Sequence, residues 1–235
     1  MHRRQFVAAG AVGGVGLSAG CLDDFLDDAT TFSASPAIVA ESATDETGYE
    51  YEGTEEIIST ESVAGQEVEV TSYGSEYVRT IDLPLDIFGD GVEAGVFTVI
   101  TTPQVSVAGE EFNPIGEMDN EELLREMQDQ YEELTIEDAV GERSVAALED
   151  TLVLETFEGE AELHGEYGID VLLDIAQHES GDDYLVVVGV YPDLEDLPID
   201  SERDRIDQMV QGLEHGEDVD AEIVESREDD DPLAD

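Results

Sequence analysis

Four β-strand-like runs between residues 142 and 191 limit the fold of this chain more than any other feature of its sequence. Apolar and β-branched residues predict strands at 142–148, 151–163, 168–178 and 183–191. The connections between these runs are short and polar, and connections of that kind join neighbouring strands as hairpins. The sequence therefore predicts an antiparallel meander.

Two longer β-rich runs precede the meander. "YEYEGTEEIISTESV" and "QEVEVTSYGSEYVRTIDL" are joined by Ala64-Gly65, which predicts a hairpin. The second run could instead break at Gly74-Ser75, but we predict one long strand. Further along, "GVFTVITT" is apolar on both faces up to Pro103, which is typical of a central strand covered on both sides.

Two segments outside the β-rich runs carry helix-start signals. Ser35-Pro36 predicts a short helix that Gly48 ends, because serine caps helices and proline favours the first helical position. Asp119 and Glu122 form a capping-box pattern before a second helix. The apolar positions of that helix are Leu123, Leu124, Met127, Tyr131 and Leu134.

A last helix is predicted from Ser201 and Asp204 to near Gly216. Its apolar face carries Ile206, Met209, Val210 and Leu213. Together with the strands, these segments predict an α+β fold, in which two or three helices pack on an antiparallel β-sheet. We expect a single globular α+β domain over residues 31–216.

The N-terminal segment carries an export address. Arg3 and Arg4 precede an uncharged stretch over residues 7–19, which has the length of a signal-peptide core and is too short to span a bilayer. "RRQFV" resembles a twin-arginine export signal. "LSAGC" resembles a lipobox, although Ser18 stands where the bacterial motif prefers Leu.

This resemblance implies a signal peptide over residues 1–20, lipidation of Cys21 and a lipidated tether over residues 21–30. It implies a location at the cell membrane, lipid-anchored and facing the extracellular side, with membrane lipid as a partner through Cys21. The alternative is a buried glycine-rich N-terminal helix with a free thiol. Cys21 is the only cysteine, so neither an intramolecular disulfide nor a multi-cysteine metal site is available.

The charge of the chain is extreme. Asp and Glu number 62 against 8 Arg and no Lys, which gives a formal net charge of −54 at pH 7. Nucleic-acid binding needs basic side chains against the phosphates, so we expect no nucleic-acid partner. A compact body with this charge repels itself at low salt and is screened at molar salt, which predicts a halophilic protein. Residues 217–235 are acidic and poor in apolar residues, which predicts a disordered tail.

Several stretches resemble one family. Beside the export signal and lipobox, they are "SPAIVAESATDETGY", "TTPQVSVAGEEFNP", "VVVGVYP" and "QGLEH". Together they resemble uncharacterised haloarchaeal lipoproteins exported by the twin-arginine route. The resemblance implies no activity, because that family has no assigned function. The order of the elements also resembles the PsbP/Mog1-like fold, and a fold alone does not imply a function.

Histidines and acids offer no strong catalytic or metal pattern. We interpret His164, His178 and His215 as structural or exposed residues, and we expect neither a metal nor a cofactor. Asp218 and Asp220, with Glu222, have the spacing of a calcium loop, but Ile223 occupies the place where that loop needs glycine. We interpret these acids as part of the solvated tail.

A loop between Pro103 and the second helix is the best candidate for binding. Phe112 and Asn113 combine an aromatic ring and an amide there, and Tyr191 lies at the end of a buried strand. The alternative is that Phe112 fills the edge of the core and Asn113 caps a turn.

These observations favour a non-enzymatic binding or envelope-associated module whose partner is an unknown envelope protein or small ligand. The alternative is an extracytoplasmic hydrolase-type enzyme with dispersed carboxylate residues. A third hypothesis is weak cation buffering by the acids. A pocket that holds a few carboxylates with raised pKa values would favour the enzyme.

Overall fold

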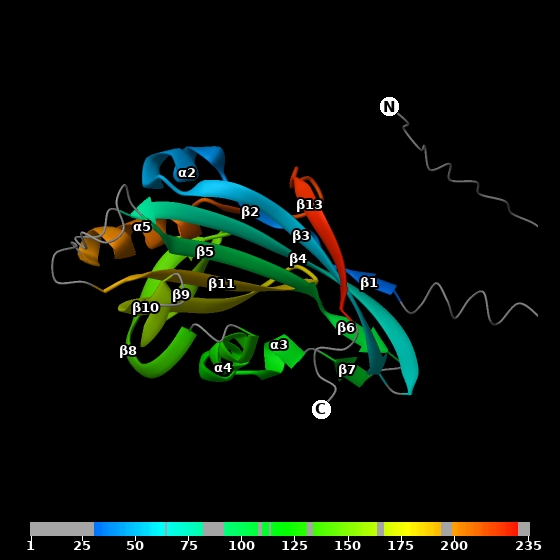
Figure 1. The fold of residues 1–235 in the computed structure, drawn as a ribbon. Coiled ribbons are helices and arrows are strands. Elements are labelled where there is room, and N and C mark those ends of the chain that lie inside the picture. Colours follow the sequence, from blue (N-terminus) through cyan, green and yellow to red (C-terminus); the bar gives the residue numbers. More distant parts are fainter. Residues whose placement is uncertain are drawn as a thin grey trace, which may run out of the picture.

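The computed structural model describes residues 31–63, 65–81, 92–107, 110–112, 114–130, 134–163, 167–193 and 199–229 (Figure 1). Arg3 and Arg4 of the export signal, Cys21 of the lipobox, and the tether lie outside the described residues.

A nine-stranded sheet is the framework of the molecule. Its strands are β1 (Thr31–Ser33), β3 (Glu50–Val63), β4 (Gln66–Ile81), β5 (Val92–Pro103), β8 (Leu134–Ala147), β9 (Asp150–Leu163), β10 (Tyr167–Ser180), β11 (Asp183–Pro192) and β13 (Ile223–Asp229). Their order is β13-β3-β4-β5-β11-β10-β9-β8, and β1 pairs with β4. Two small sheets join β2 (Ala37–Val39) to β12 (Leu213–His215) and β6 (Val105–Val107) to β7 (Glu110–Phe112).

Helices lie on both sides of the sheet. Figure 1 shows α2 (Glu41–Thr47) and α5 (Ile199–Gln211) on one side, and α3 (Pro114–Glu117) and α4 (Asn120–Gln130) on the other. The described residues are thus mostly β-strand, with a large mixed sheet and four helices. This architecture fits the expected α+β class.

The hairpins are where the sequence pattern placed them. β3 and β4 pair across the turn at Gly65, with Val63 opposite Gln66, and β4 is one long strand through Gly74. β8 to β11 form the antiparallel meander. β5 lies between β4 and β11 and packs on both faces, because Phe97 belongs to one core cluster and Ile100 packs against another.

The expectation of a purely antiparallel sheet needs a correction. β1 runs parallel to β4, with Thr31 opposite Glu69, and β13 runs parallel to β3, with Ile223 opposite Thr54. Neither strand is joined to its partner by a tight turn, so no hairpin fixes its direction. Alternation of side chains shows which face a residue takes but says nothing about strand direction.

The first helix begins later than predicted. Ala37 and Val39 are buried and form β2, and α2 begins only at Glu41, with no side-chain cap on Ala40. Pairing of β2 with β12 and burial of its side chains outweigh the local helix-start signal. The predicted end is correct, since Gly48 takes the left-handed conformation with φ 75°.

Other boundaries differ at the chain's second half. α5 ends at Gln211, and Leu213 continues as β12 against Val39. β8 begins at Leu134, which the sequence pattern assigned to the preceding helix. Residues 217–235 were expected to be disordered, but within them Ile223–Asp229 form β13 on the edge of β3. Main-chain pairing needs no apolar composition, so the charge pattern did not reveal this strand.

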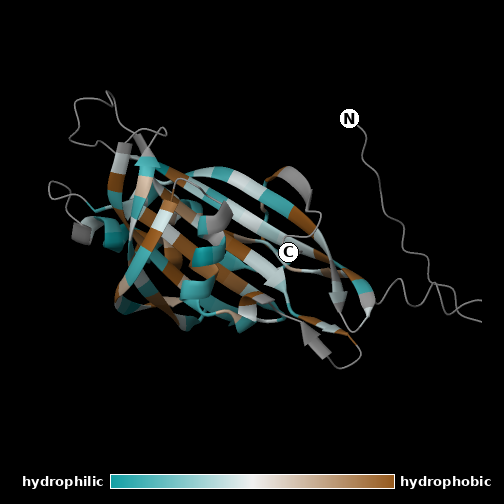
Figure 2. Cartoon of the chain, turned by 60° about the horizontal axis from the view of Figure 1, so that its bottom comes forward, coloured by the Kyte–Doolittle hydropathy of each residue, from teal (hydrophilic) through white to brown (hydrophobic). Residues whose placement is uncertain are grey.

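The two faces of the sheet bury separate cores. Leu172 belongs to the cluster beneath α2 and α5, whereas the next residue, Leu173, belongs to the cluster beneath α4. Buried residues therefore follow each other without alternation over residues 171–176 of β10 and 185–189 of β11, and Figure 2 shows hydrophobic residues gathered on the central strands of the sheet. A small third cluster joins β4 to the β6–β7 hairpin through Val70 and Val105.

Candidate functional site

An open cleft of about 640 Å³ lies where the end of the β10–β11 hairpin meets β2 and β12. Its lining residues are Ile38, Leu148, Glu149, Ser180, Glu214, His215, Asp218, Val219 and Asp220. They come from β2, the β8–β9 turn, the end of β10, β12 and the segment that leads to β13. The cleft is thus assembled from parts of the chain that are distant in sequence.

His215 is held by the last pair of the hairpin. Ser180 and Asp183 face each other across the turn at Gly181. The His215 ring lies between them, with Nδ1 3.0 Å from Ser180 Oγ and Nε2 3.0 Å from Asp183 Oδ2. An ionised Asp183 can only accept, so in the neutral ring Nε2 carries the hydrogen and Nδ1 accepts from the serine hydroxyl.

Asp183 is fixed from a second direction. Its Oδ2 also accepts a hydrogen bond from the backbone N–H of Ser35 at 2.9 Å. The side chains of His215 and Asp183 are only 8% and 10% exposed. This contact ties the segment before β2 and the strand β12 to the tip of the β10–β11 hairpin.

The β8–β9 turn forms one wall of the cleft in a strained conformation. Leu148 and Glu149 have φ values of 51° and 61°, a region that residues other than glycine rarely occupy. Two such residues in succession match a tight hairpin turn that usually contains Asn-Gly. Leu148 packs against the main core cluster, which accounts for a leucine at this position.

The electrostatic character of the cleft is negative. Apart from His215, its titratable lining residues are all carboxylates, namely Glu149, Glu214, Asp218 and Asp220. Such a lining disfavours anions and favours neutral or positively charged ligands. Among the described residues, no group of three or more His, Cys, Asp or Glu has an arrangement that could hold a metal ion.

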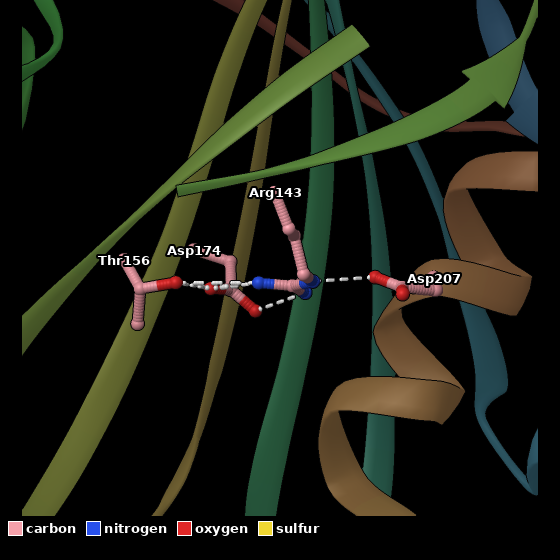
Figure 3. Close-up of polar contacts among 4 residues, drawn as sticks. All are labelled: Arg143, Thr156, Asp174 and Asp207. Carbon is pink, nitrogen blue, oxygen red and sulfur yellow. Dashed lines mark hydrogen bonds and ion pairs between the residues drawn. The ribbon is translucent and has the colours of Figure 1, made fainter. Parts of the chain in front are cut away.

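A second polar cluster lies between α5 and the sheet. Figure 3 shows Arg143 on β8 reaching both Asp174 on β10 and Asp207 on α5. The guanidinium binds Asp174 through two hydrogen bonds of 2.7 and 2.6 Å, and Nε donates to Asp207 Oδ1 at 2.7 Å. Thr156 donates to Asp174 Oδ1 at 2.6 Å. The carboxylate of Asp174 is fully buried and is satisfied from three donors.

The acidic partners in this cluster stabilise the charged form of Arg143. Burial disfavours the charged guanidinium, but the hydrogen bonds and charge of Asp174, followed by those of Asp207, outweigh it and raise the pKa of Arg143 above its ordinary value. None of the four residues lines the cleft. The cluster therefore joins α5 to the meander and supports the fold beside the cleft.

Other arginines also bind α5 to its neighbours. Arg79 of β4 pairs with the buried Glu202 of α5 and lies over the ring of Tyr49, with its guanidinium carbon 5.8 Å from the ring centroid. Arg205 donates to the backbone oxygen of Thr47 at 2.7 Å. Together with Arg143, three of the eight arginines thus make contacts within the domain.

The predicted binding loop is not assembled as one site. Phe112 lies on β7 opposite Val105, and Asn113 falls outside the described residues. Tyr191 is fully buried beneath α5. The register pairs Asp183 with Pro103, near the β6–β7 hairpin, and so places Tyr191 at the other end of β11. Burial, followed by the charge of Asp174, raises the pKa of the Tyr191 hydroxyl.

His215 and His178 lie in different surroundings. His215 is a largely buried, hydrogen-bonded residue, which agrees with its structural interpretation and adds the cleft as its surroundings. His178 is half-buried on β10 opposite Leu185. His164 lies outside the described residues.

Sequence reasoning missed the partners of these groups. Asp174 interrupts the apolar run "VLLDIA", and an acid inside a buried strand is a signal for a hidden cation. Ser180 and Asp183 flank a Gly-containing turn, so their proximity followed from the hairpin that the sequence predicted. Their contact with His215 depends on the β2–β12 pairing, which the sequence did not reveal.

A search of curated proteins finds no match. No helix in the described part of the chain is long and apolar enough to cross a membrane. A model of a domain of unknown function, DUF6517, matches residues 36–214, which include both polar clusters apart from Ser35 and His215. Because this match covers most of the chain, the protein belongs to the DUF6517 family.

Proposed function

We propose that this protein is a lipid-anchored extracytoplasmic lipoprotein of a halophile, and that it acts as a non-enzymatic binding module. The observation that carries the binding role is the open cleft beside His215, with apolar side chains of Ile38, Leu148 and Val219 among carboxylates. A concave site of this size suits a small ligand. Its negative lining selects a neutral or cationic ligand.

The N-terminal segment supports the anchoring part of this proposal. The twin-arginine and lipobox motifs precede a tether over residues 21–30, and the first strand begins at Thr31. Ten extended residues reach about 30 Å. A lipid on Cys21 would therefore keep the domain close to the membrane surface.

Fractionation of cells tests the anchor. Replacing Arg3 and Arg4 by lysine should leave unprocessed precursor in the cytoplasm, because the export route reads the arginine pair. Cys21→Ser should allow export but abolish lipid attachment, so the protein should move to the medium. Membrane retention of Cys21→Ser equal to that of the natural chain would contradict the lipobox interpretation.

A thermal-shift screen in molar KCl tests the cleft. Neutral and amine-bearing small molecules serve as probes, and a ligand that binds only the folded state raises the Tm by mass action. Val219→Trp places an indole in the cleft and should abolish the shift. Val153→Trp is the matched control, because Val153 is 50% exposed and does not line the cleft. A shift that survives Val219→Trp would place binding elsewhere.

The Ser180–His215–Asp183 contacts favour one second candidate, a serine hydrolase. Ser180 Oγ would attack the carbonyl carbon of an ester while its proton passes to His215 Nδ1. The leaving alcohol would take that proton, and water would then release the acid and restore the serine. Asp183 on Nε2 would stabilise the charged ring in the intermediate step.

A fluorophosphonate probe separates the two candidates. Covalent labelling of the natural chain that Ser180→Ala abolishes, and that Ser144→Ala on β8 leaves unchanged, would support the hydrolase. Absence of labelling, together with a cleft-dependent thermal shift, would support the binding module.

A further inference from the structure

The two parallel strands lie outside the family domain. The DUF6517 match covers residues 36–214, whereas β1 ends at Ser33 and β13 begins at Ile223. Every other strand pairing in the described residues is antiparallel. Without β13, the outer edge of β3 from Thr54 to Ser59 would present unpaired backbone groups, which is the arrangement that recruits another strand.

We propose that this edge of β3 is a strand-docking site that the chain's own C-terminal segment closes, and that it accepts the same segment from a second copy of the chain. The product is a dimer in which the two copies exchange β13. An exchanged strand makes the contacts that it makes within one chain, so exchange costs little beyond association.

The edge recognises a particular side chain as well as backbone. Gly53 has φ 130°, and a Cβ added there would lie 2.6 Å from Cγ2 of Val224. Val224 is the extra residue at a bulge, because Ile223 pairs with Thr54 and Glu225 with Glu55. The missing side chain of Gly53 is therefore a notch that receives Val224, and the bulge sets the register.

The docking site stays in place without its strand. Thr54 is fully buried, and its Oγ1 lies 2.7 Å from Ser75 Oγ, which donates to the backbone oxygen of Ala37 at 2.6 Å. β3 is also paired with β4 along its whole length. Departure of β13 thus leaves the acceptor edge ordered, which a strand from another copy needs.

The first two residues of the resident strand, by contrast, are weakly buried. Ile223 is 44% exposed and Val224 is 57% exposed, so little apolar surface holds them. The described residues between β12 and β13 make few backbone bonds: Glu222 O accepts from Thr54 N at 2.8 Å, Val219 N donates to Gly216 O at 3.1 Å, and Gly216 N donates to Pro36 O at 3.5 Å. Segments with few buried contacts open at a small free-energy cost.

Two complementary full-length variants test the exchange. Val224→Asp should free the edge of β3, because a carboxylate would replace the two methyl groups that lie against Gly53. Gly53→Val should free the segment, because its side chain fills the notch. Each variant alone should be a monomer by native mass spectrometry in volatile salt after equilibration in molar KCl. Their mixture should form a one-to-one dimer, because one copy offers the edge and the other the intact segment.

A peptide experiment decides the matter if Gly53→Val fails to fold. A labelled peptide of residues 221–235 should bind the full-length Val224→Asp chain saturably, while the same peptide carrying Val224→Asp should bind at least tenfold more weakly. Hydrogen exchange at the Thr54 amide should be fast in the variant and slow again with the natural peptide. Equal binding of the two peptides, or none with the far-UV spectrum unchanged, would overturn the proposal.

Discussion

Buried or partly buried ion pairs lie between α5 and the sheet. The fully buried Asp174 pairs with Arg143 and accepts a hydrogen bond from Thr156, and the buried Glu202 pairs with Arg79. A buried charge is tolerated only when it is paired and hydrogen-bonded. In a chain with only 8 basic residues, these arginines have few substitutes.

Removal of Arg143 gives the first prediction. Arg143→Met leaves the carboxylate of Asp174 buried without its cation, so the free energy of unfolding should fall by about 3–5 kcal/mol. Denaturant unfolding in molar KCl measures it. Glu121→Gln is the control, because its pair with Arg125 is exposed and its loss should cost less than about 1 kcal/mol. Equal losses for the two variants would contradict the structural role of Arg143.

Glu76 gives a prediction of the opposite sign. Partial burial, followed by the charges of Glu52 and Glu55, raises the pKa of Glu76 above its ordinary value of 4.5. A raised pKa means that ionisation of Glu76 destabilises the folded state. The stability that the protonated carboxyl contributes is therefore lost as the pH rises above the ordinary pKa. Glu76→Gln should therefore stabilise the protein at pH 7, by up to ~0.5 kcal/mol because the side chain is solvent-screened.

The pH dependence provides the check on Glu76. Well below pH 4.5 the carboxyl is protonated in both the folded and the unfolded chain, so natural and variant proteins should have the same stability there. Thermal unfolding at several pH values compares them. A variant that is less stable than the natural chain at pH 7 would contradict the assigned repulsion.

At the scale of elements, local signals and tertiary contacts determine different parts of the fold. The β3–β4 hairpin and the meander follow from turn residues and from apolar runs. α4 begins at the predicted capping box, where Glu122 N donates to Asp119 Oδ1 at 2.9 Å and Asp119 N to Glu122 Oε2 at 3.1 Å. Such features involve neighbours in sequence and are therefore predictable.

Elements formed by distant partners were not predictable. β2 replaces a predicted helical turn because Val39 pairs with Leu213, far along the chain. β13 is acidic in sequence yet adds to the edge of β3 through its backbone. The cleft depends on both, since Ile38 belongs to β2 and Asp220 precedes β13. The candidate site was therefore less predictable than the fold.

The capping box carries the element-scale prediction. Asp119→Ala removes the side-chain acceptor from the first turn of α4, so the protein should lose about 1 kcal/mol of stability. Urea unfolding followed by circular dichroism measures the loss. Asp150→Ala is the comparison, because Asp150 Oδ1 accepts from the adjacent Thr151 N at the start of β9 and caps no helix. Identical stabilities for natural and Asp119→Ala proteins would show that packing alone fixes the start of α4.

At the scale of the whole molecule, the net charge of −54 governs the conditions under which the fold persists. The Debye length is about 10 Å at 0.1 M salt and about 3 Å at 1 M. Repulsion among surface carboxylates should thus lower the Tm at 0.1 M by about 10 °C or more, on the order of 3 kcal/mol for a domain of this size.

Calorimetry in NaCl and KCl tests this effect of screening. The two salts should restore the Tm about equally, and millimolar calcium should add little in molar KCl. A saturable rise with calcium at high salt would instead indicate a specific ion site. Full stability in 0.1 M NaCl without divalent ions would contradict the halophilic interpretation.

The mass of the protein extracted from its native membrane tests the central claim most directly, because anchoring requires both cleavage and lipidation at one residue. Intact-mass and N-terminal peptide analysis should find a chain that begins at Cys21 and carries lipid on that cysteine. A membrane-bound chain that retains Arg3 and Arg4, or one with an unmodified Cys21 thiol, would contradict the account of a lipid-anchored extracytoplasmic protein.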